Sequence, residues 1–219
     1  MPRRDRVARN ARGEKVARNA RGEKVARNAR EKQVVRIDRV STRGGDGGET
    51  SLGDGTRLGK DTPRIAAIGD VDEANAAIGV LRLHTREMPG IDAVLARIQN
   101  ELFDVGADLC VPDTAGDRLR LTDTPLRALE ADAAALNATL PPLDSFVLPA
   151  GTAGAAHAHM ARTIARRAER AVVHLHGSAP LNANLIRYLN RLSDYLFILA
   201  RALNAPAGVE PKWRPGGEG

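Results

Sequence analysis

The sequence predicts an all-α protein built as an up-and-down bundle of five helices. Three observations predict this fold: apolar residues recur at spacings of three and four from Arg64 onward, proline and glycine separate these periodic segments, and no strand-like alternation competes with them. Short connections favour antiparallel neighbours. With only three Phe, two Tyr and one Trp, the core must consist of Leu, Ile, Val and Ala, so oligomerisation is a reasonable expectation.

Each helix is predicted by one apolar stripe. In chain order the stripes are Ile65, Ile68, Val71, Ile78 and Leu81; Ile91, Val94, Leu95, Ile98, Leu102, Val105 and Leu109; Leu126, Leu129, Ala133 and Leu136; Ile164, Ala168, Val172 and Leu175; and Leu185, Leu189, Leu192, Leu196, Leu199 and Leu203. The last stripe alternates steps of four and three, which is typical of coiled-coil packing. Thr124 and Pro125 are expected as the cap and first-turn proline of the third helix.

Four regions are expected along the chain: a tail (1–33), a loop (34–63), the helical bundle (64–205) and a flexible C-terminal tail (206–219). The first tail repeats VARNARGEK and holds 12 Lys and Arg against 4 Asp and Glu, whereas the rest of the chain holds 21 against 23. Each repeat offers one valine and two alanines, too little to offset the entropy of ordering, so we expect disorder. Glutamates within the repeat and the absence of interleaved aromatics argue against a nucleic-acid partner.

Compartment and metal content are also indicated. A single cysteine, Cys110, cannot form an internal disulfide and is expected to be a small buried hydrophobe. No apolar run is long enough for a membrane span, and no signal-peptide core follows Met1, so a cytoplasmic protein is expected. His157 and His159 are two apart and face different ways on a helix, so no metal site is expected.

The stretch TRGGDGGETSLGDG, from Thr42 to Gly55, is the most unusual part of the sequence. Glycine-rich backbone of this kind is either a linker or a loop shaped for a ligand. It lacks the order of a P-loop. It nevertheless offers successive amides, hydroxyl groups and cations of the kind that phosphate needs. Both interpretations stay open on composition alone.

Polar groups on the last two helices suggest a pocket. Arg162, Arg166 and Arg170 share one face of the fourth helix, and Asn190 and Asp194 lie one turn apart on the fifth. Arginine forks suit phosphate oxygens. The alternatives are a solvated basic face and, on the fifth helix, pairing among Arg187, Arg191 and Asp194.

Three segments together resemble a known family. The segments TRGGDGGETSLGDGTRLGKD with GDVDEANAAIG, SFVLPAG with ARTIARRAER, and YLNRLSDYLFILARALN are similar, in order and spacing, to those of the PduO-type ATP:cob(I)alamin adenosyltransferases. The resemblance runs from about Val34 to Trp213. It implies a homotrimer with active sites between subunits, ATP bound with Mg²⁺, and transfer of the 5′-deoxyadenosyl group to the cobalt of cob(I)alamin with release of triphosphate.

The resemblance also implies roles for individual residues. The ATP-binding positions it implies are Thr42, Arg43, Gly44, Gly45, Thr50, Ser51, Lys60, Arg166, Arg167, Ala168, Glu169, Arg170 and Asn190. Asp72 is implied to pair across the subunit interface with Arg162, and Phe146 to lie on the lower face of the corrin, keeping the lower axial ligand off cobalt. A cob(II)alamin reductase and an adenosylcobalamin-dependent mutase are the protein partners it suggests.

The chain departs from the family pattern in its loop. Gly44 stands where the family usually has a second threonine, and Gly47 follows Asp46, so one hydroxyl contact is lost. This leaves open a non-catalytic regulator that binds nucleotide or cobalamin on the same fold. The absence of a general-base constellation agrees with catalysis, because cob(I)alamin is already a strong nucleophile and the protein needs only to position substrates and stabilise the departing triphosphate.

Overall fold

The computed structural model describes residues 41, 43–112 and 118–216. The chain divides into two units, Met1–Arg43 and Gly44–Gly219. The repeat tail, residues 34–40 of the expected loop, and Thr42 lie outside the described residues.

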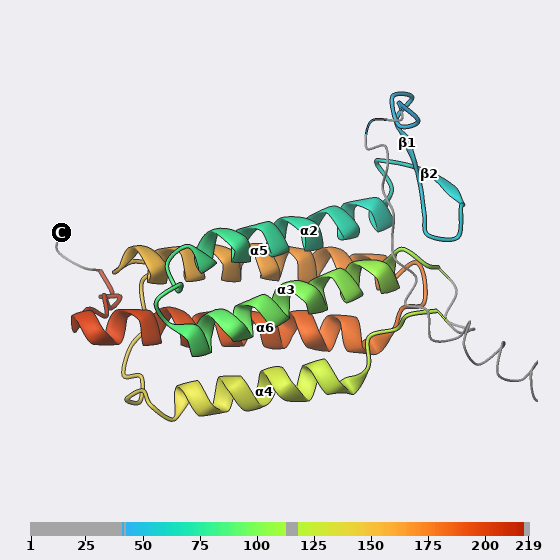
Figure 1. The fold of residues 1–219 in the computed structure, drawn as a ribbon. Coiled ribbons are helices and arrows are strands. Elements are labelled where there is room, and N and C mark those ends of the chain that lie inside the picture. The colour runs from blue at the N-terminus through green and yellow to red at the C-terminus, as the bar shows by residue number, and fades with distance from the viewer. Residues whose placement is uncertain (1–40, 42, 113–117, 217–219) are drawn as a thin grey trace, which may run out of the picture. The chain divides into compact units, whose positions relative to one another are not determined.

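The second unit contains the five helices that the apolar stripes predict. They are α2 (Pro63–Arg82), α3 (Pro89–Leu109), α4 (Asp123–Asn137), α5 (Ala153–His176) and α6 (Ala183–Asn204). Consecutive helices run in opposite directions (Figure 1), so the helical, up-and-down part of the prediction is confirmed. Helix α5 packs against α2 and α6, α3 packs against α2, and α4 packs against α6. Among the described residues no helix has the length and apolar character that crossing a bilayer requires.

The core is one cluster of buried apolar side chains, to which all five helices contribute. All six leucines of the predicted α6 stripe are buried. Opposite them α5 presents small side chains, such as Ala161, Ala165 and Ala168, each at most 1% exposed. Small residues allow the helix axes to approach closely, which explains how a core poor in aromatics is filled.

The all-α prediction needs one correction, because the glycine-rich stretch forms a small hairpin. Strands β1 (Glu49–Ser51) and β2 (Arg57–Gly59) pair antiparallel, with Thr50 opposite Leu58 and Ser51 opposite Arg57. Strands of three residues are too short to show the alternation by which a strand is recognised from sequence.

The start of α4 also differs from the expectation. The helix begins at Asp123, and Thr122 is its N-cap, with its hydroxyl accepting a hydrogen bond from the Thr124 amide at 3.4 Å. Thr124 and Pro125 therefore lie inside the first turn. Both threonines fit a cap by residue type, so the sequence alone did not distinguish them.

The segment after α6 has a regular path as far as Trp213, although a flexible tail was expected from residue 206. A 3₁₀ turn (Ala205–Ala207) follows the helix, and Val147 and Lys212 form an isolated antiparallel bridge. The Trp213 amide donates to the Phe146 carbonyl at 2.8 Å. Buried Arg201 pairs with Glu210 at 2.7 Å. These contacts hold the C-terminal segment against the loop between α4 and α5.

Candidate functional site

The hairpin end of the bundle holds the glycine-rich candidates. The Lys60 ammonium donates to the Gly45 carbonyl at 2.9 Å, and the Gly48 amide donates to the same carbonyl at 3.2 Å. A Cβ at Gly45 would lie 2.9 Å from the Lys60 nitrogen, so a side chain there would displace the lysine. Gly44, Gly45, Thr50, Ser51 and Lys60 thus lie on one small hairpin. Arg43 is exposed and has a positive φ of 60°.

The hairpin is fastened to the bundle at its tip. Leu52 is buried, and the Gly53 amide donates to both the carbonyl and the sulfur of Cys110, at 3.1 and 3.2 Å. Cys110 was expected to be a buried hydrophobe, but it is half-buried and serves as an acceptor at the end of α3. Arg64, itself buried, donates to the Leu109 carbonyl at 2.6 Å and satisfies another free acceptor of the same helix end.

The middle of α5 carries the predicted arginine face. Arg166 is exposed, and its guanidinium has no partner among the described side chains and backbone groups. Arg170 donates to the Arg166 carbonyl at 3.2 Å, which turns its side chain along the helix. Burial lowers the pKa of Arg162, and the charge of Arg166 lowers it further. The Nε atom of Arg162 is buried without a hydrogen-bond partner in the described part of the chain.

Neighbouring residues of the same motif have different surroundings. Arg167 forms ion pairs with Glu73 and, at 3.4 Å, with Asp70, both on α2. Glu169 accepts a hydrogen bond from Asn190 on α6 at 3.0 Å, so the expected polar contact between these two helices exists. The side chain of Ala168 is fully buried in the core and is not part of this surface.

The alternative considered for the last helix is partly correct. Arg191 pairs with Asp194 at 2.6 Å and also with Glu130 of α4. Arg187 points instead toward Asp123, at 3.4 Å. These arginines are therefore bound to carboxylates on the outer surface, and they do not join the Arg166 face.

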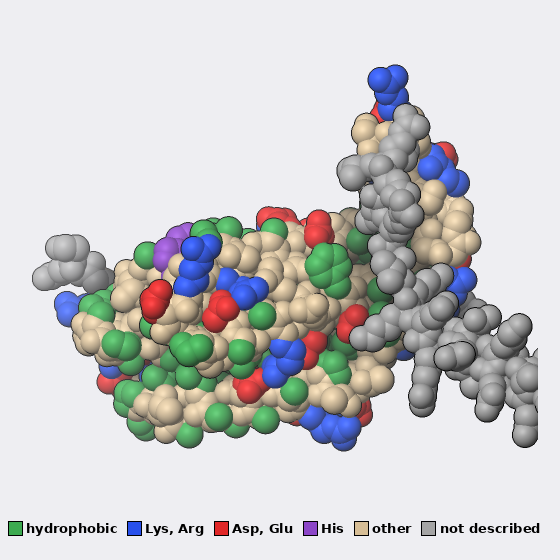
Figure 2. All heavy atoms as spheres, in the orientation of Figure 1, with side chains coloured by type: hydrophobic (Ala, Val, Ile, Leu, Met, Phe, Trp, Pro, Cys, Tyr) green, Lys and Arg blue, Asp and Glu red, His purple; other side chains and the backbone are tan. Residues whose placement is uncertain are grey.

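An apolar groove lies between α2 and α3. It has a volume of about 460 Å³, and its lining includes Ile65, Ile68, Asp72 and Phe103. Phe103 is 71% exposed, and Asp72 is exposed without an ion-pair partner among the described residues. Figure 2 shows hydrophobic side chains lying open among charged ones on the viewed face of the helices.

The opposite end of the bundle holds the candidate corrin residue. Phe146 is 78% exposed, and its ring meets Trp213 edge to face with centroids 6.0 Å apart. The two rings, with Leu143 and Pro215, line a hollow of about 620 Å³. Sequence reasoning missed Trp213. The available signal was a single tryptophan in a chain poor in aromatics.

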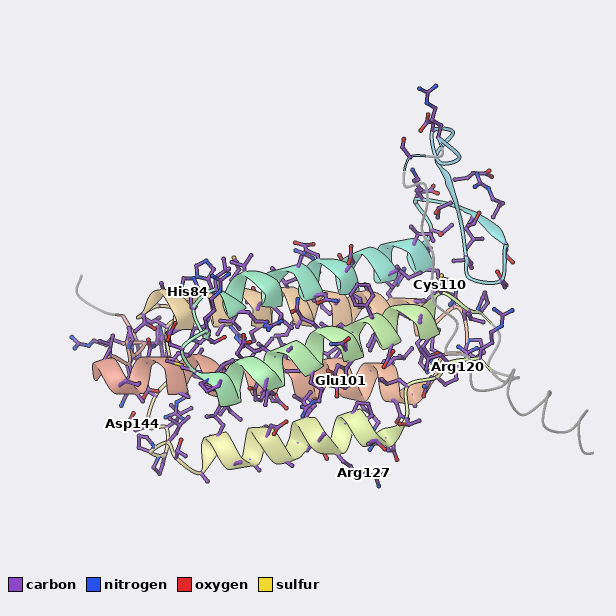
Figure 3. All side chains as sticks on the ribbon, viewed as in Figure 1. His84, Glu101, Cys110, Arg120, Arg127 and Asp144 are labelled. Carbon is purple, nitrogen blue, oxygen red and sulfur yellow. The ribbon has the colours of Figure 1, made fainter. Side chains whose placement is uncertain are left out.

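The two ends are separated by the length of the bundle. Figure 3 labels Cys110, where the hairpin tip is fastened, and Asp144, two residues before Phe146, at opposite ends of the helices. A helix of 24 residues such as α5 spans about 36 Å at 1.5 Å per residue. Within one chain, therefore, the glycine-rich candidates and the aromatic candidates do not come together.

Comparison with known proteins identifies relatives over most of the chain. Residues 40–203 match the family model described as cobalamin adenosyltransferase. A cobalamin adenosyltransferase of Cupriavidus metallidurans is 47% identical over 180 residues, covering 82% of this chain and 96% of the relative. A corrinoid adenosyltransferase of Mycobacterium tuberculosis is 45% identical over 192 residues, covering 84% and 97%.

Solved structures agree with the sequence comparison. A variant PduO-type ATP:corrinoid adenosyltransferase from Lactobacillus reuteri, complexed with cobalamin and ATP, superposes with a TM-score of 0.75 at 34% identity, covering 80% of this chain and 99% of that one. A second variant of the same enzyme, complexed with ATP, gives a TM-score of 0.73 at 35% identity over 80% and 100%.

Proposed function

We propose which parts of this chain, a member of the cobalamin adenosyltransferase family and an ATP:corrinoid adenosyltransferase, bind each of its two substrates. The hairpin of one subunit and the α5 face of a neighbouring subunit hold ATP. The Phe146 end of the bundle holds the corrin. The enzyme transfers the 5′-deoxyadenosyl group of ATP to the cobalt of cob(I)alamin. We further propose that it works as a homotrimer with its sites between subunits.

The separation of the two ends carries this proposal. Transfer requires the C5′ atom of ATP to lie next to cobalt. Within one chain, however, the hairpin and the Phe146 loop lie at opposite ends of the helical bundle. A second copy can supply the missing half of each site. In a closed ring such as a trimer, every subunit makes the same two contacts, one with each neighbour.

The groove between α2 and α3 is consistent with assembly. An exposed aromatic such as Phe103 in an apolar groove marks an interaction surface. Asp72 lies at the same groove without an ion-pair partner in the described part of the chain, and Arg162 has a buried, unpartnered Nε. A bond between Asp72 of one subunit and Arg162 of the next would satisfy both groups.

The reaction itself needs no proton transfer. The cobalt lone pair attacks C5′, the C5′–O bond breaks, and the electron pair leaves with triphosphate. Protein groups contribute by orienting the two substrates and stabilising the charge that develops on the leaving group. Arg166 suits this task because its guanidinium is not already neutralised by a carboxylate. Lys60 suits it because its present acceptor is only a carbonyl.

Corrin binding is proposed for the aromatic end. A flat macrocycle is complemented by exposed rings, and the hollow beside Phe146 and Trp213 provides apolar surface of that kind. An aromatic ring beneath cobalt excludes the lower ligand, which makes reduction to cob(I) less unfavourable. Corrin binding at this place would account for the exposure of two large rings at one end of the bundle.

Mg²⁺ is proposed to accompany ATP. This ion takes most of its ligands from phosphates and water and needs only one or two protein carboxylates. The hairpin fits that requirement, since Asp46 is exposed in its turn without an ion-pair partner among the described residues. Bound there, the ion would offset phosphate charge.

The remaining expectations on partners and compartment stay part of this proposal. A reductase must supply cob(I)alamin, because that oxidation state is needed for attack on carbon. An adenosylcobalamin-dependent enzyme such as a mutase would consume the product. The cytoplasm suits a chain with a single cysteine, which cannot form a disulfide within the chain. The non-catalytic regulator is not retained, since the named relatives are adenosyltransferases.

Subunit mixing tests the shared site. Lys60→Ala and Phe146→Ala chains, each inactive or nearly so alone, are co-expressed with different tags and the mixed oligomers are purified. If the two residues act from different chains, about one third of the sites in a purified mixed trimer regain both groups. Activity near that fraction, measured by the visible absorbance of adenosylcobalamin, supports the shared site. Mixed oligomers as inactive as their parents would place both residues in one chain's site and contradict it.

A further inference from the structure

Arg57 on β2 holds several parts of the hairpin at once. One Nη atom donates to the Gly44 carbonyl at 2.9 Å and lies 3.2 Å from the Glu49 carboxylate. The other Nη donates to the Ser51 hydroxyl at 3.4 Å. Arg57 also lies directly opposite Ser51 in the strand register. A single guanidinium therefore connects β2 to both ends of β1 and to the glycine pair that precedes it.

This connection matters because the hairpin has little stability of its own. A two-stranded hairpin in water is marginal at best, and glycine loses more entropy on ordering than any other residue. An exposed ion pair alone contributes little. A planar fork that also binds a backbone carbonyl and a hydroxyl imposes one geometry on all its acceptors.

Arg57 and Lys60 act on neighbouring peptides but differ in what neutralises them. Lys60 donates to the neutral Gly45 carbonyl, which an anionic phosphate oxygen would readily outcompete. Arg57 donates to a carboxylate, so its charge is already compensated. When nucleotide arrives, Lys60 is the cation free to turn to it, and Arg57 is the one that stays on the loop.

We propose that Arg57 is a positioning residue for ATP: bound to Gly44, Glu49 and Ser51, it keeps the glycine-rich turn before β1 in its nucleotide-binding shape while Lys60 turns to the phosphates. This inference rests on the proposed assignment of the hairpin as the ATP site. In a trans peptide, the carbonyl of one residue and the amide N–H of the next residue point in opposite directions. By fixing the Gly44 carbonyl toward β2, Arg57 turns the Gly45 amide away from β2.

Steady-state kinetics and calorimetry test the proposal. Arg57→Ala should raise the KM for ATP about tenfold, through loss of preorganisation, with kcat within threefold and the KM for cob(I)alamin unchanged. Arg57→Lys, which keeps the charge but not the fork, should give an intermediate KM. Glu49→Gln should shift the KM in the same direction by a smaller factor. The matched control is Arg127→Ala, an exposed arginine on α4 (Figure 3) that should behave as wild type.

Each outcome is decisive. An unchanged KM for ATP in Arg57→Ala overturns the proposal, as does a loss of kcat equal to that of Lys60→Ala, which would make Arg57 itself a phosphate ligand. If Lys60→Ala and Arg57→Ala both leave ATP binding unaltered in an active enzyme, the hairpin is not the ATP site, and the proposed function fails at that point. Faster amide hydrogen exchange of residues 44–48 in Arg57→Ala, with helix exchange unchanged, would confirm that the shape of the glycine-rich turn has been lost.

Discussion

The hairpin end and the Phe146 end of the bundle are fixed by different kinds of contact. At the hairpin, cations bind backbone carbonyls, as Lys60 does with Gly45 at 2.9 Å, and Leu52 is the only buried residue between Gly44 and Lys60. At the other end, backbone hydrogen bonds between the C-terminal segment and the loop that contains Phe146 present two aromatic rings. Polar, adjustable contacts suit a polyanion, whereas a rigid apolar surface suits a flat macrocycle. Changes at one end should therefore alter one substrate and spare the other.

The largest effect on activity is expected from a change between the two ends, in the middle of α5. Arg166→Ala on α5 should lower kcat by about 30- to 1000-fold, because losing one charge-assisted phosphate contact in a water-excluded site costs roughly 2–4 kcal/mol of transition-state stabilisation. Helix content, measured by circular dichroism, should be unchanged. Arg127→Ala is the control for removal of an exposed arginine. Activity within threefold of wild type would mean that Arg166 is only a solvated charge.

The aromatic end should give the next largest effect, confined to the corrin. Phe146→Ala removes apolar contact worth about 1.5–3 kcal/mol, so the second-order rate constant with cob(I)alamin should fall about 12- to 160-fold. Trp213→Ala should cost less, roughly 2- to 12-fold, since an edge-to-face pair contributes about 0.5–1.5 kcal/mol. Calorimetric titration with ATP should be unaffected by either change. A weakened ATP affinity in Phe146→Ala would break the distinction between the two ends.

The two ends also differ in what sequence can predict. Helices are predictable because burial is periodic, and the α6 leucines from Leu185 to Leu203 are buried as their spacing requires. The contact between Phe146 and Trp213 joins distant segments, and no local pattern encodes it. At the hairpin, composition left a linker and a phosphate-binding loop both open, and the resemblance was needed to choose between them. Arg57 escaped notice because its importance depends on three acceptors that the fold brings together.

Between the ends, a buried histidine should make stability depend on pH. Burial lowers the pKa of His159, and the charge of Arg162 lowers it further. The imidazole packs against Phe197, and its nitrogens have no partners among the described residues. The unfolded chain therefore binds a proton near pH 6.5 that the folded chain resists, so stability falls as pH drops below 6.5 toward the folded pKa.

Thermal unfolding at pH 7.5 and pH 5.5 measures this dependence. His159→Gln should reduce the decrease in Tm between the two values, because it removes the titrating group from the core. His174→Gln, at an exposed position near the end of α5, is the matched control and should keep the wild-type difference. Equal pH dependence in all three proteins would show that His159 is protonated without cost in the folded state.

The smallest effect is expected from deleting residues 1–33, and it should concern ATP alone. This segment carries 12 Lys and Arg against 4 Asp and Glu, and in the sequence it precedes the glycine-rich stretch rather than the Phe146 loop. Its charge can attract a polyanion, but exposed charges farther apart than about 8–10 Å are screened at physiological salt. Deletion should therefore raise the KM for ATP slightly at low salt, leave kcat unchanged, and have no effect on cob(I)alamin. Rates measured at two salt concentrations separate the electrostatic effect on the KM for ATP from any effect on kcat. A fall in kcat that persists at high salt would mean that the repeat takes part in the nucleotide site, and the polar end would then extend beyond the hairpin.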